Sequence, residues 1–303
     1  MIHDNITEFF GLPVQDFSQS DDWKGAGIAY RVRIDWESEA SVSKLLQELA
    51  QNSGADQLRA VVLGHWGGDD PSSSSASSIK TLCELAGQFK SLQAIFVGDI
   101  AGEENEISWI TQSDIAPLLM AYPKLQVLRA RGGNDLEFGP VEHSSLKQLT
   151  LEAGGLDRKT VRQVLQSSLP ALEHLELWLG TNEYGGSTTI EDLQPLLNGN
   201  LFPQLSYLGI RNTDGIDDFV PTIVNSPILN RIRTLDSSLG NLSDVGARSL
   251  LELTNNSSLK TLNLSHHYVS DEMGTQLAKL PFEVVLENGQ GTADEWHSIY
   301  VSE

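Results

Sequence analysis

The sequence predicts an α/β solenoid, a repeat array in which the short strands of a parallel β-sheet alternate with helices. Three observations lead to this prediction. A short apolar pattern, L-x-x-L-x-L, recurs along the chain. Successive copies begin 21 to 34 residues apart, a period typical of stacked repeats. Between the copies lie segments whose apolar residues follow helical spacing.

The pattern occurs often enough to define a strand register. Its eight copies, of which the one at Ile232 is weaker, begin at Leu58, Leu92, Leu125, Leu146, Leu172, Leu205, Ile232 and Leu259. We therefore predict strands at 58–64, 92–97, 125–130, 146–151, 172–177, 205–210, 232–237 and 259–264. All of them should stack in parallel within one continuous array. In each copy the first, fourth and sixth positions should face the core, and the third and fifth should face the concave surface.

These copies resemble the leucine-rich repeat superfamily. The longer units are similar to its ribonuclease-inhibitor-like subclass, which implies a curved solenoid with a parallel β-sheet on the concave side and α-helices on the convex side. The resemblance covers residues 58–286, predicted as about eight repeats. More narrowly, the segments EISWITQSDIAPLL, LEHLELWLGTNEYGG and LSHHYVSDEM resemble a family of bacterial cytosolic leucine-rich repeat proteins. That family has no assigned activity that the resemblance could transfer.

Helices are expected after most of the strands. Ser270 is a plausible N-cap, and Asp271 and Glu272 follow it in the first turn, where the helix dipole favours acidic residues. Cys83 lies on the apolar side of its expected helix, which favours a packing role. The predicted helices span 77–89, 111–123, 157–170, 189–199, 243–257 and 270–280.

The two ends of the chain depart from the repeat. Residues 1–57 are predicted to form an N-terminal cap with a strand at 28–36 and a helix at 41–50, and residues 1–24 are expected to be irregular. A last strand is predicted at 281–289, and residues 287–303 are predicted to form a C-terminal cap. Such caps are needed because open repeat ends expose apolar surface. The serine-rich stretch 67–78 is predicted to be a solvated loop.

Composition limits the classes of partner. The formal charge is −21, with 41 acidic and 20 basic residues, and no Lys/Arg cluster is present to bind a phosphate backbone. No apolar run of about 18 residues and no signal-peptide pattern is present in the sequence. We therefore expect no nucleic-acid partner, no membrane partner and a cytoplasmic location.

Motifs for catalysis and cofactor binding are missing from the sequence. It has no G-x-x-x-x-G-K-[ST], no H-E-x-x-H, no C-x-x-C and no G-x-S-x-G, and GAGIAY (25–30) lacks the third glycine of a dinucleotide loop. We predict a non-catalytic scaffold without a cofactor. The alternative left open is an enzyme, or an accessory subunit that presents a substrate to a partner enzyme.

Two adjacent histidines, His266 and His267, raise the question of a metal site. In the repeat frame His267 takes the ninth position and should point inward, whereas His266 should point to the rim. Side chains that diverge in this way do not share one ion easily, and a metal requires further convergent ligands. We therefore predict a structural role for His267 and no metal site.

The concave face is the predicted binding surface, for an unidentified protein or peptide. Arg131, Glu152, Trp178 and Arg211 occupy the seventh position of successive copies. Tryptophan, tyrosine and arginine are enriched at interface hot spots, and three arginines would form a local basic spot that favours an acidic partner segment. The opposing interpretation is a surface ion pair of Arg131 with Glu152 and a packed Trp178. The loop 180–188 is expected to be a lip beside this surface. The predicted binding residues are Arg129, Arg131, Glu152, His174, Glu176, Trp178, Tyr207 and Arg211.

Overall fold

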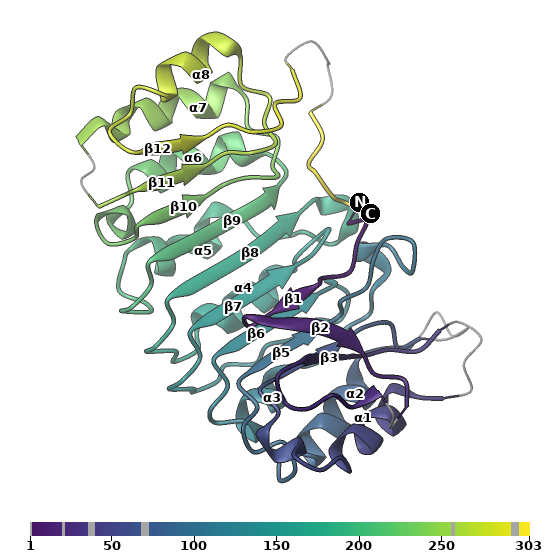
Figure 1. Ribbon diagram of the computed structural model, residues 1–303. Helices are drawn as coiled ribbons and strands as arrows, with labels where there is room; N and C mark the ends of the chain where they lie inside the picture. Colours follow the sequence, from purple (N-terminus) through teal and green to yellow (C-terminus); the bar gives the residue numbers. More distant parts are fainter. Residues whose placement is uncertain (1, 20–21, 36–39, 68–72, 256–257, 292–296) are drawn as a thin grey trace. The chain divides into compact units, whose positions relative to one another are not determined.

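A computed structural model describes residues 2–19, 22–35, 40–67, 73–255, 258–291 and 297–303. It has an α/β fold with a twelve-stranded sheet whose strands follow one another in chain order (Figure 1). The chain divides into two compact units. Unit 1 comprises Met1–Leu151, Gln166–Pro170 and Glu303, and unit 2 comprises Glu152–Leu165 and Ala171–Ser302.

The described residues of unit 1 contain the first strands and three α-helices. Strand β1 pairs antiparallel with β2, and β2 to β6 pair in parallel. The strands are β1 (Glu8–Phe9), β2 (Leu12–Asp16), β3 (Ala29–Val32), β4 (Ala60–Leu63), β5 (Ala94–Val97), β6 (Val127–Arg131) and β7 (Gln148–Glu152), whose last residue belongs to unit 2. The helices are α1 (Val42–Ala50), α2 (Ala76–Glu84) and α3 (Ala116–Ala121), with 3₁₀ turns η2 (Ala55–Gln57) and η3 (Ile107–Trp109).

Unit 2 repeats one strand–helix plan along its length, and β8 to β12 pair in parallel. Its strands are β8 (His174–Gly180), β9 (Tyr207–Thr213), β10 (Thr234–Asp236), β11 (Thr261–Asn263) and β12 (Glu283–Val285). Its helices are α4 (Arg158–Leu165), α5 (Ile190–Leu197), α6 (Ile216–Val224), α7 (Asp244–Leu250) and α8 (Asp271–Leu277). The 3₁₀ turns are η4 (Asn182–Tyr184), η5 (Pro227–Asn230) and η6 (Leu251–Asn255).

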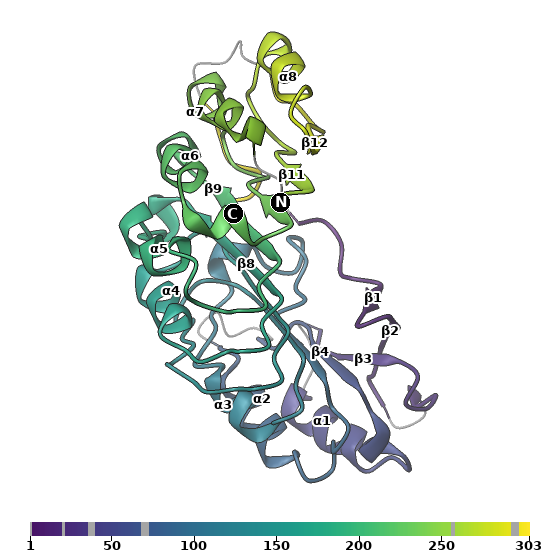
Figure 2. The same ribbon diagram turned by 90° about the vertical axis from the view of Figure 1, so that its left-hand side faces the viewer.

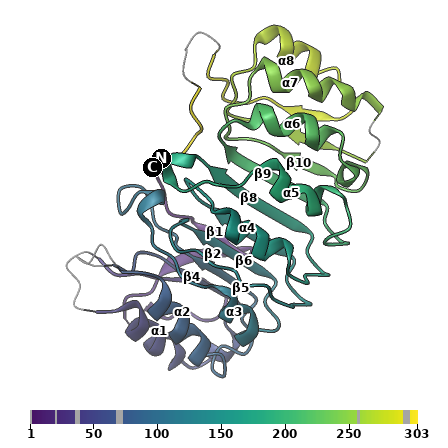
Figure 3. The same ribbon diagram turned by 180° about the vertical axis from the view of Figure 1, so that it is seen from behind.

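The core of unit 2 lies between its sheet and its helices, which cover one face of the sheet (Figure 3). Leu175, Leu208, Leu235 and Leu262, the fourth positions of four copies, are all buried and lie side by side in the parallel register. Because side chains alternate along a strand, the third and fifth positions point to the opposite face. The predicted strand register and the inward leucines are therefore confirmed.

Helix starts follow the expected capping chemistry. The Ser270 side chain accepts a hydrogen bond from the backbone N–H of Met273, as predicted, and Ser243 caps α7 in the same way through Val245. Helix α5 begins with a reciprocal capping box between Thr189 and Asp192. Helix α6 was not predicted from the sequence.

Residues 8–16 form a β-hairpin, so the prediction that 1–24 is irregular is wrong for that part of the range. Strands β1 and β2 form the first edge of the sheet and fold over the face of β4 and β5 that is opposite to α2 and α3 (Figure 2). Phe9 packs against Phe96 of β5 with ring centroids 6.1 Å apart, in a cluster that includes Val62 of β4. The outward face of β4 and β5 is apolar, and burying it under the hairpin removes that surface from water.

Hydrogen bonds and ion pairs hold the segment before the hairpin. Asp99, which is fully buried after β5, accepts from the Ile6 backbone N–H and from Arg31 of β3. The Asn5 amide donates to the Asp99 carbonyl and to Glu104.

The predicted strand 28–36 is shorter in the structure, Ala29–Val32, and its residue 36 lies outside the described residues. Residues 68–72 of the predicted loop and 256–257 of the predicted helix also lie outside them.

Candidate binding face of unit 2

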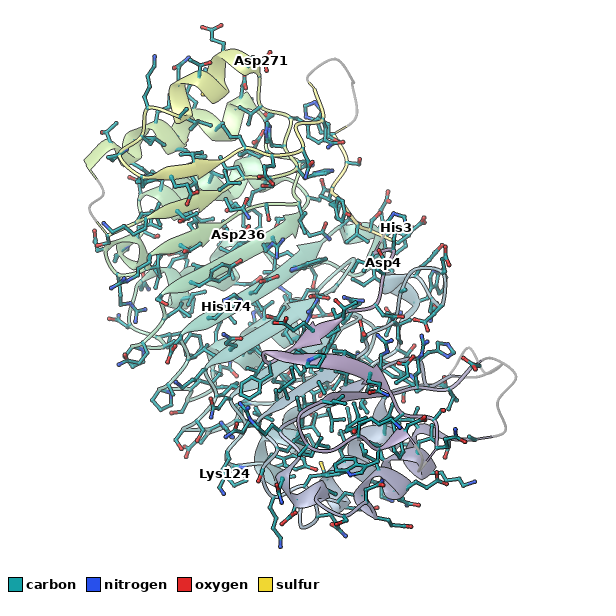
Figure 4. All side chains as sticks on the ribbon, viewed as in Figure 1. His3, Asp4, Lys124, His174, Asp236 and Asp271 are labelled. Carbon is teal, nitrogen blue, oxygen red and sulfur yellow. The ribbon has the colours of Figure 1, made fainter. Side chains whose placement is uncertain are left out.

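The outward side chains of β8 to β11 form one continuous row of polar and aromatic groups, which we call the unit 2 face. Pairing sets His174 beside Tyr207, Trp178 beside Arg211, and Asp236 beside Asn263. Figure 4 labels His174 and Asp236 on the side of the sheet away from the helices. The unit 2 face consists of His174, Glu176, Trp178, Tyr207, Gly209, Arg211, Thr234, Asp236, Thr261 and Asn263.

Glu176 is the centre of the hydrogen bonds on β8. Its Oε1 accepts from Nε1 of Trp178 at 2.7 Å and from Nη1 of Arg211 at 2.6 Å. Its Oε2 lies 3.3 Å from Nε2 of His174. Burial opposes ionisation of this carboxyl, but the hydrogen bonds from His174 and Trp178 and the Arg211 charge outweigh it and lower its pKa to about 2. Glu176 is therefore a fixed negative charge at neutral pH.

Asp236 plays the corresponding part on β10. Its Oδ2 accepts from the Tyr207 hydroxyl at 2.7 Å and from the Asn263 amide at 3.0 Å, and its Oδ1 lies 3.4 Å from Nε of Arg211. Burial, with the nearby charges of Glu176 and Asp236, raises the pKa of Tyr207, so this phenol stays protonated and donates. Burial lowers the pKa of Arg211, but the two carboxylates outweigh that effect and raise it.

Gly209 makes this network possible because it provides room on β9. A Cβ atom there would lie 3.0 Å from Cγ of Glu176 and 3.2 Å from Cε1 of Tyr207. These neighbouring side chains fold over the glycine, so Glu176 on β8 and Arg211 on β9 can meet above it. A residue with a side chain would force them apart.

A stacked aromatic pair is partly exposed on the face. The rings of His174 and Tyr207 stack with centroids 3.8 Å apart and planes 8° apart. Both residues are partly exposed, whereas Glu176, Asp236 and Trp178 are buried. The network thus holds two partly exposed rings at the surface, while its two carboxylates, Glu176 and Asp236, are buried.

The two predicted arginines of unit 1 have a different environment. The guanidinium groups of Arg129 and Arg131 lie 4.3 and 5.3 Å from the ring centroid of Phe96. Arg131 is buried, lies 3.7 Å from Asp99 and donates to the Ile100 carbonyl at 3.0 Å. Because Phe9 also packs on Phe96, these cations are part of the contact region of the N-terminal hairpin.

The structure brings five of the eight predicted binding residues into direct contact: His174, Glu176, Trp178, Tyr207 and Arg211. Glu152 belongs to unit 2 but is buried. The prediction of a local basic spot is wrong for Arg131 and Arg211, because each lies against carboxylates. Instead, Glu176, Asp236 and Arg211 together carry one net negative charge.

Sequence reasoning did not select Gly209, Asp236 and Asn263. All three occupy the fifth position of their copies, and lateral pairing places them in one row beside Glu176. The sequence contained a signal for this network, because Gly209 lies between two acidic residues, Glu176 and Asp236, at the fifth positions of consecutive copies. A sequence pattern does not show the directions of these side chains, so it could not predict the hydrogen bonds among them.

The adjacent histidines have separate surroundings. Nδ1 of His266 lies 3.1 Å from the Gly240 carbonyl, and its ring meets those of Tyr268 and Tyr300 edge-on. His267 accepts from the Val269 backbone N–H through Nδ1, and burial lowers its pKa. His266 was predicted to reach the rim, but it is buried next to the last residues of the chain. Among the described residues, no group of three or more His, Cys, Asp or Glu side chains could hold a metal ion.

Comparison with known proteins places this α/β architecture in a family. The chain is similar to a protein of known structure from Bacteroides fragilis, with 31% sequence identity and a TM-score of 0.81 over 90% of this chain and 76% of that one. The chain belongs to the same family as that protein. An internalin from Listeria monocytogenes aligns with a TM-score of 0.41 and 13% identity, over 86% of this chain and 67% of that one, which is too weak to support an argument.

Comparisons with protein-family models and with curated proteins found no match. Within the described residues, no helix combines the length and apolar character that crossing a bilayer requires.

Proposed function

We propose that this protein is a leucine-rich repeat scaffold of the ribonuclease-inhibitor-like subclass, which binds a protein or peptide on the unit 2 face without catalysing a reaction. One observation carries the proposal. The unit 2 face holds the stacked His174–Tyr207 pair on a hydrogen-bonded network, whereas the outward face of β4 and β5 is packed under the protein's own hairpin. The cytoplasmic location remains a prediction.

The rigidity of the network supports a role in recognition. Four strands contribute to it, and Glu176, Arg211 and Asp236 each make contacts across strands. Side chains that are already ordered lose little entropy when a partner binds, which favours affinity. A tyrosine ring fixed by its hydroxyl is also a typical interface anchor.

The electrostatics of the face support binding rather than acid–base chemistry. A general acid or base works best when its pKa lies near the operating pH. Glu176 has its pKa lowered to about 2, and the pKa of Tyr207 is raised, so both are moved away from neutral pH. The residual negative charge favours a neutral or basic partner segment over an acidic one.

A blocking variant tests the proposal. Thr234 lies beside Tyr207 on the face and is partly exposed, so Thr234→Arg adds bulk without removing a group of the network. The matched control is Met120→Arg on α3, where the wild-type side chain is highly exposed. We expect the protein recovered with wild type from cell lysate to be lost with Thr234→Arg and kept with Met120→Arg, with equal melting temperatures for the two variants. Equal recovery by both would refute the unit 2 face as the site.

A further inference from the structure

Residues 297–302, just before the end of the chain, run along the ends of β11, β10 and β9 as an extended segment (Figure 1). We call them the C-terminal segment. Ile299 and Val301 are buried, whereas Tyr300 between them is exposed. This alternation is that of a strand with one face against the protein. The segment is therefore bound in the way that an extended peptide binds to a receptor.

Three loop positions contact this segment, one from each of three successive copies. We call Asn212, Leu239 and His266 the loop row, since each is the eighth residue of its copy. All three have positive φ, at 48°, 66° and 59°. Residues other than glycine rarely adopt this left-handed region, and such strain persists where surrounding structure enforces it, often at binding sites. The left-handed backbone conformation thus recurs at the three positions that contact the C-terminal segment.

Asn212 recognises the backbone of the segment. Its side chain is fully buried, its Nδ2 donates to the Val301 carbonyl at 2.5 Å, and its Oδ1 accepts from the Val301 N–H at 3.1 Å. Both amide groups therefore pair with one residue, as a neighbouring strand would. Nδ2 also donates to the Ala153 carbonyl at 3.3 Å, which orients the amide, and the extended chain supplies the matching N–H and C=O groups.

The rest of the loop row fixes the register of the segment. The Leu239 carbonyl accepts from the Tyr300 N–H at 2.8 Å, and the His266 ring meets the Tyr300 ring edge-on at 5.6 Å. Beyond the row, the Tyr268 hydroxyl donates to the Ser298 carbonyl and accepts from the Ser298 N–H. The receptor thus forms hydrogen bonds with backbone groups of Ser298, Tyr300 and Val301, and Ile299 contributes a buried side chain.

We propose that the loop row is a second binding site, for an extended peptide with two β-branched residues separated by one, and that the C-terminal segment is its resident, exchangeable ligand. Main-chain hydrogen bonds supply affinity in this kind of recognition, and the buried alternate side chains supply selectivity. The site lies at the loop ends of unit 2 and is separate from the unit 2 face. If the loop row proved not to bind a peptide, the proposed function of the unit 2 face would be unaffected.

The test begins with the folded full-length chain. A protease site is inserted between Gly291 and His297 and cut after folding, which turns the segment into a separable peptide. A fluorescent peptide with the sequence HSIYVSE is then added, and its anisotropy reports binding. We expect saturable uptake by the cut protein and none by the uncut protein, where the tethered segment has a high effective concentration.

Peptide variants test whether the C-terminal segment is an exchangeable ligand or a permanent part of the fold, because they leave the receptor unchanged. A peptide carrying the change Val301→Asp should bind at least tenfold more weakly than HSIYVSE. On the receptor, Asn212→Ala should weaken binding by a similar factor. The control Asn225→Ala, whose exposed amide bonds the Pro221 carbonyl, should not. The proposal is overturned if the labelled peptide never exchanges into the cut protein, if the Val301→Asp peptide binds equally, or if the uncut protein binds as well as the cut one.

Discussion

Arg211 on β9 donates from Nη1 to Oε1 of Glu176 on β8 over 2.6 Å. The same guanidinium donates from Nε to the Ser238 hydroxyl after β10 at 2.9 Å. One arginine therefore connects three consecutive strands on the side of the sheet away from the helices. An ion pair is a strong contact when it is partly buried and when both partners make further hydrogen bonds, the arginine as donor and the carboxylate as acceptor, whereas a solitary exposed pair contributes little.

Glu176→Gln should lower the free energy of unfolding at pH 7, because the amide cannot replace the carboxylate. The folded pKa of about 2 lies below the ordinary value of 4.5, so the stabilisation is present above about pH 4.5 and is lost as the pH falls towards 2. The shift corresponds to about 3 kcal/mol. Denaturant unfolding from pH 7 to pH 3 should show the difference between variant and wild type shrinking with acidity. Glu183→Gln, at an exposed side chain of η4, is the control and should stay near wild type throughout.

Gly209→Ala should destabilise unit 2 although it adds a single methyl group. The new Cβ would press on Glu176 and Tyr207, and overpacking of this kind costs about 1–3 kcal/mol. Chemical unfolding measures the effect. Gly27→Ala is the matched control, since nothing lies within 4 Å of a Cβ at Gly27. Equal stability of the two variants would contradict the role given to Gly209.

Leu175→Ala and Leu262→Ala should each lower the free energy of unfolding by about 2–5 kcal/mol, because both leucines are fully buried between sheet and helices. Thermal or denaturant melts provide the measurement. Val245→Ala, at a highly exposed position of α7, should change stability by less than about 0.5 kcal/mol. A leucine variant as mild as this control would show that the inward face is misassigned.

Phe9→Ala should destabilise the N-terminal hairpin, because Phe9 is buried against Phe96. Removing a buried phenylalanine side chain costs about 3–5 kcal/mol. Limited proteolysis should cut the first twenty residues faster in the variant, and amide exchange of β1 and β2 should accelerate. Trp109→Ala, at an exposed position of unit 1, provides the control and should leave both unchanged.

Local pattern was sufficient for the strands of the repeats, β4 to β11, and for most of the helices, because each repeat buries its leucines in the same way. It was not sufficient for α6, which begins right after the long strand β9 and contains Pro221. A proline inside a helix removes one backbone donor and usually argues against the assignment. Packing against α7, where Asp217 accepts from the Ser243 backbone and side chain, gives the helix partners that its own sequence does not show.

The sequence by itself determined which residues point outward from β8 to β11, because alternation along a strand is a local property. It placed Trp178 beside Arg211 correctly, since parallel strands with the same repeat pair in register. Only the tertiary structure decided what these side chains do there. Burial and cross-strand hydrogen bonding depend on neighbours from other repeats, so Arg211 became the partner of Glu176 rather than a free cation. For the same reason, the hairpin that covers Phe96 and the segment bound at Asn212 could not be inferred from any local pattern.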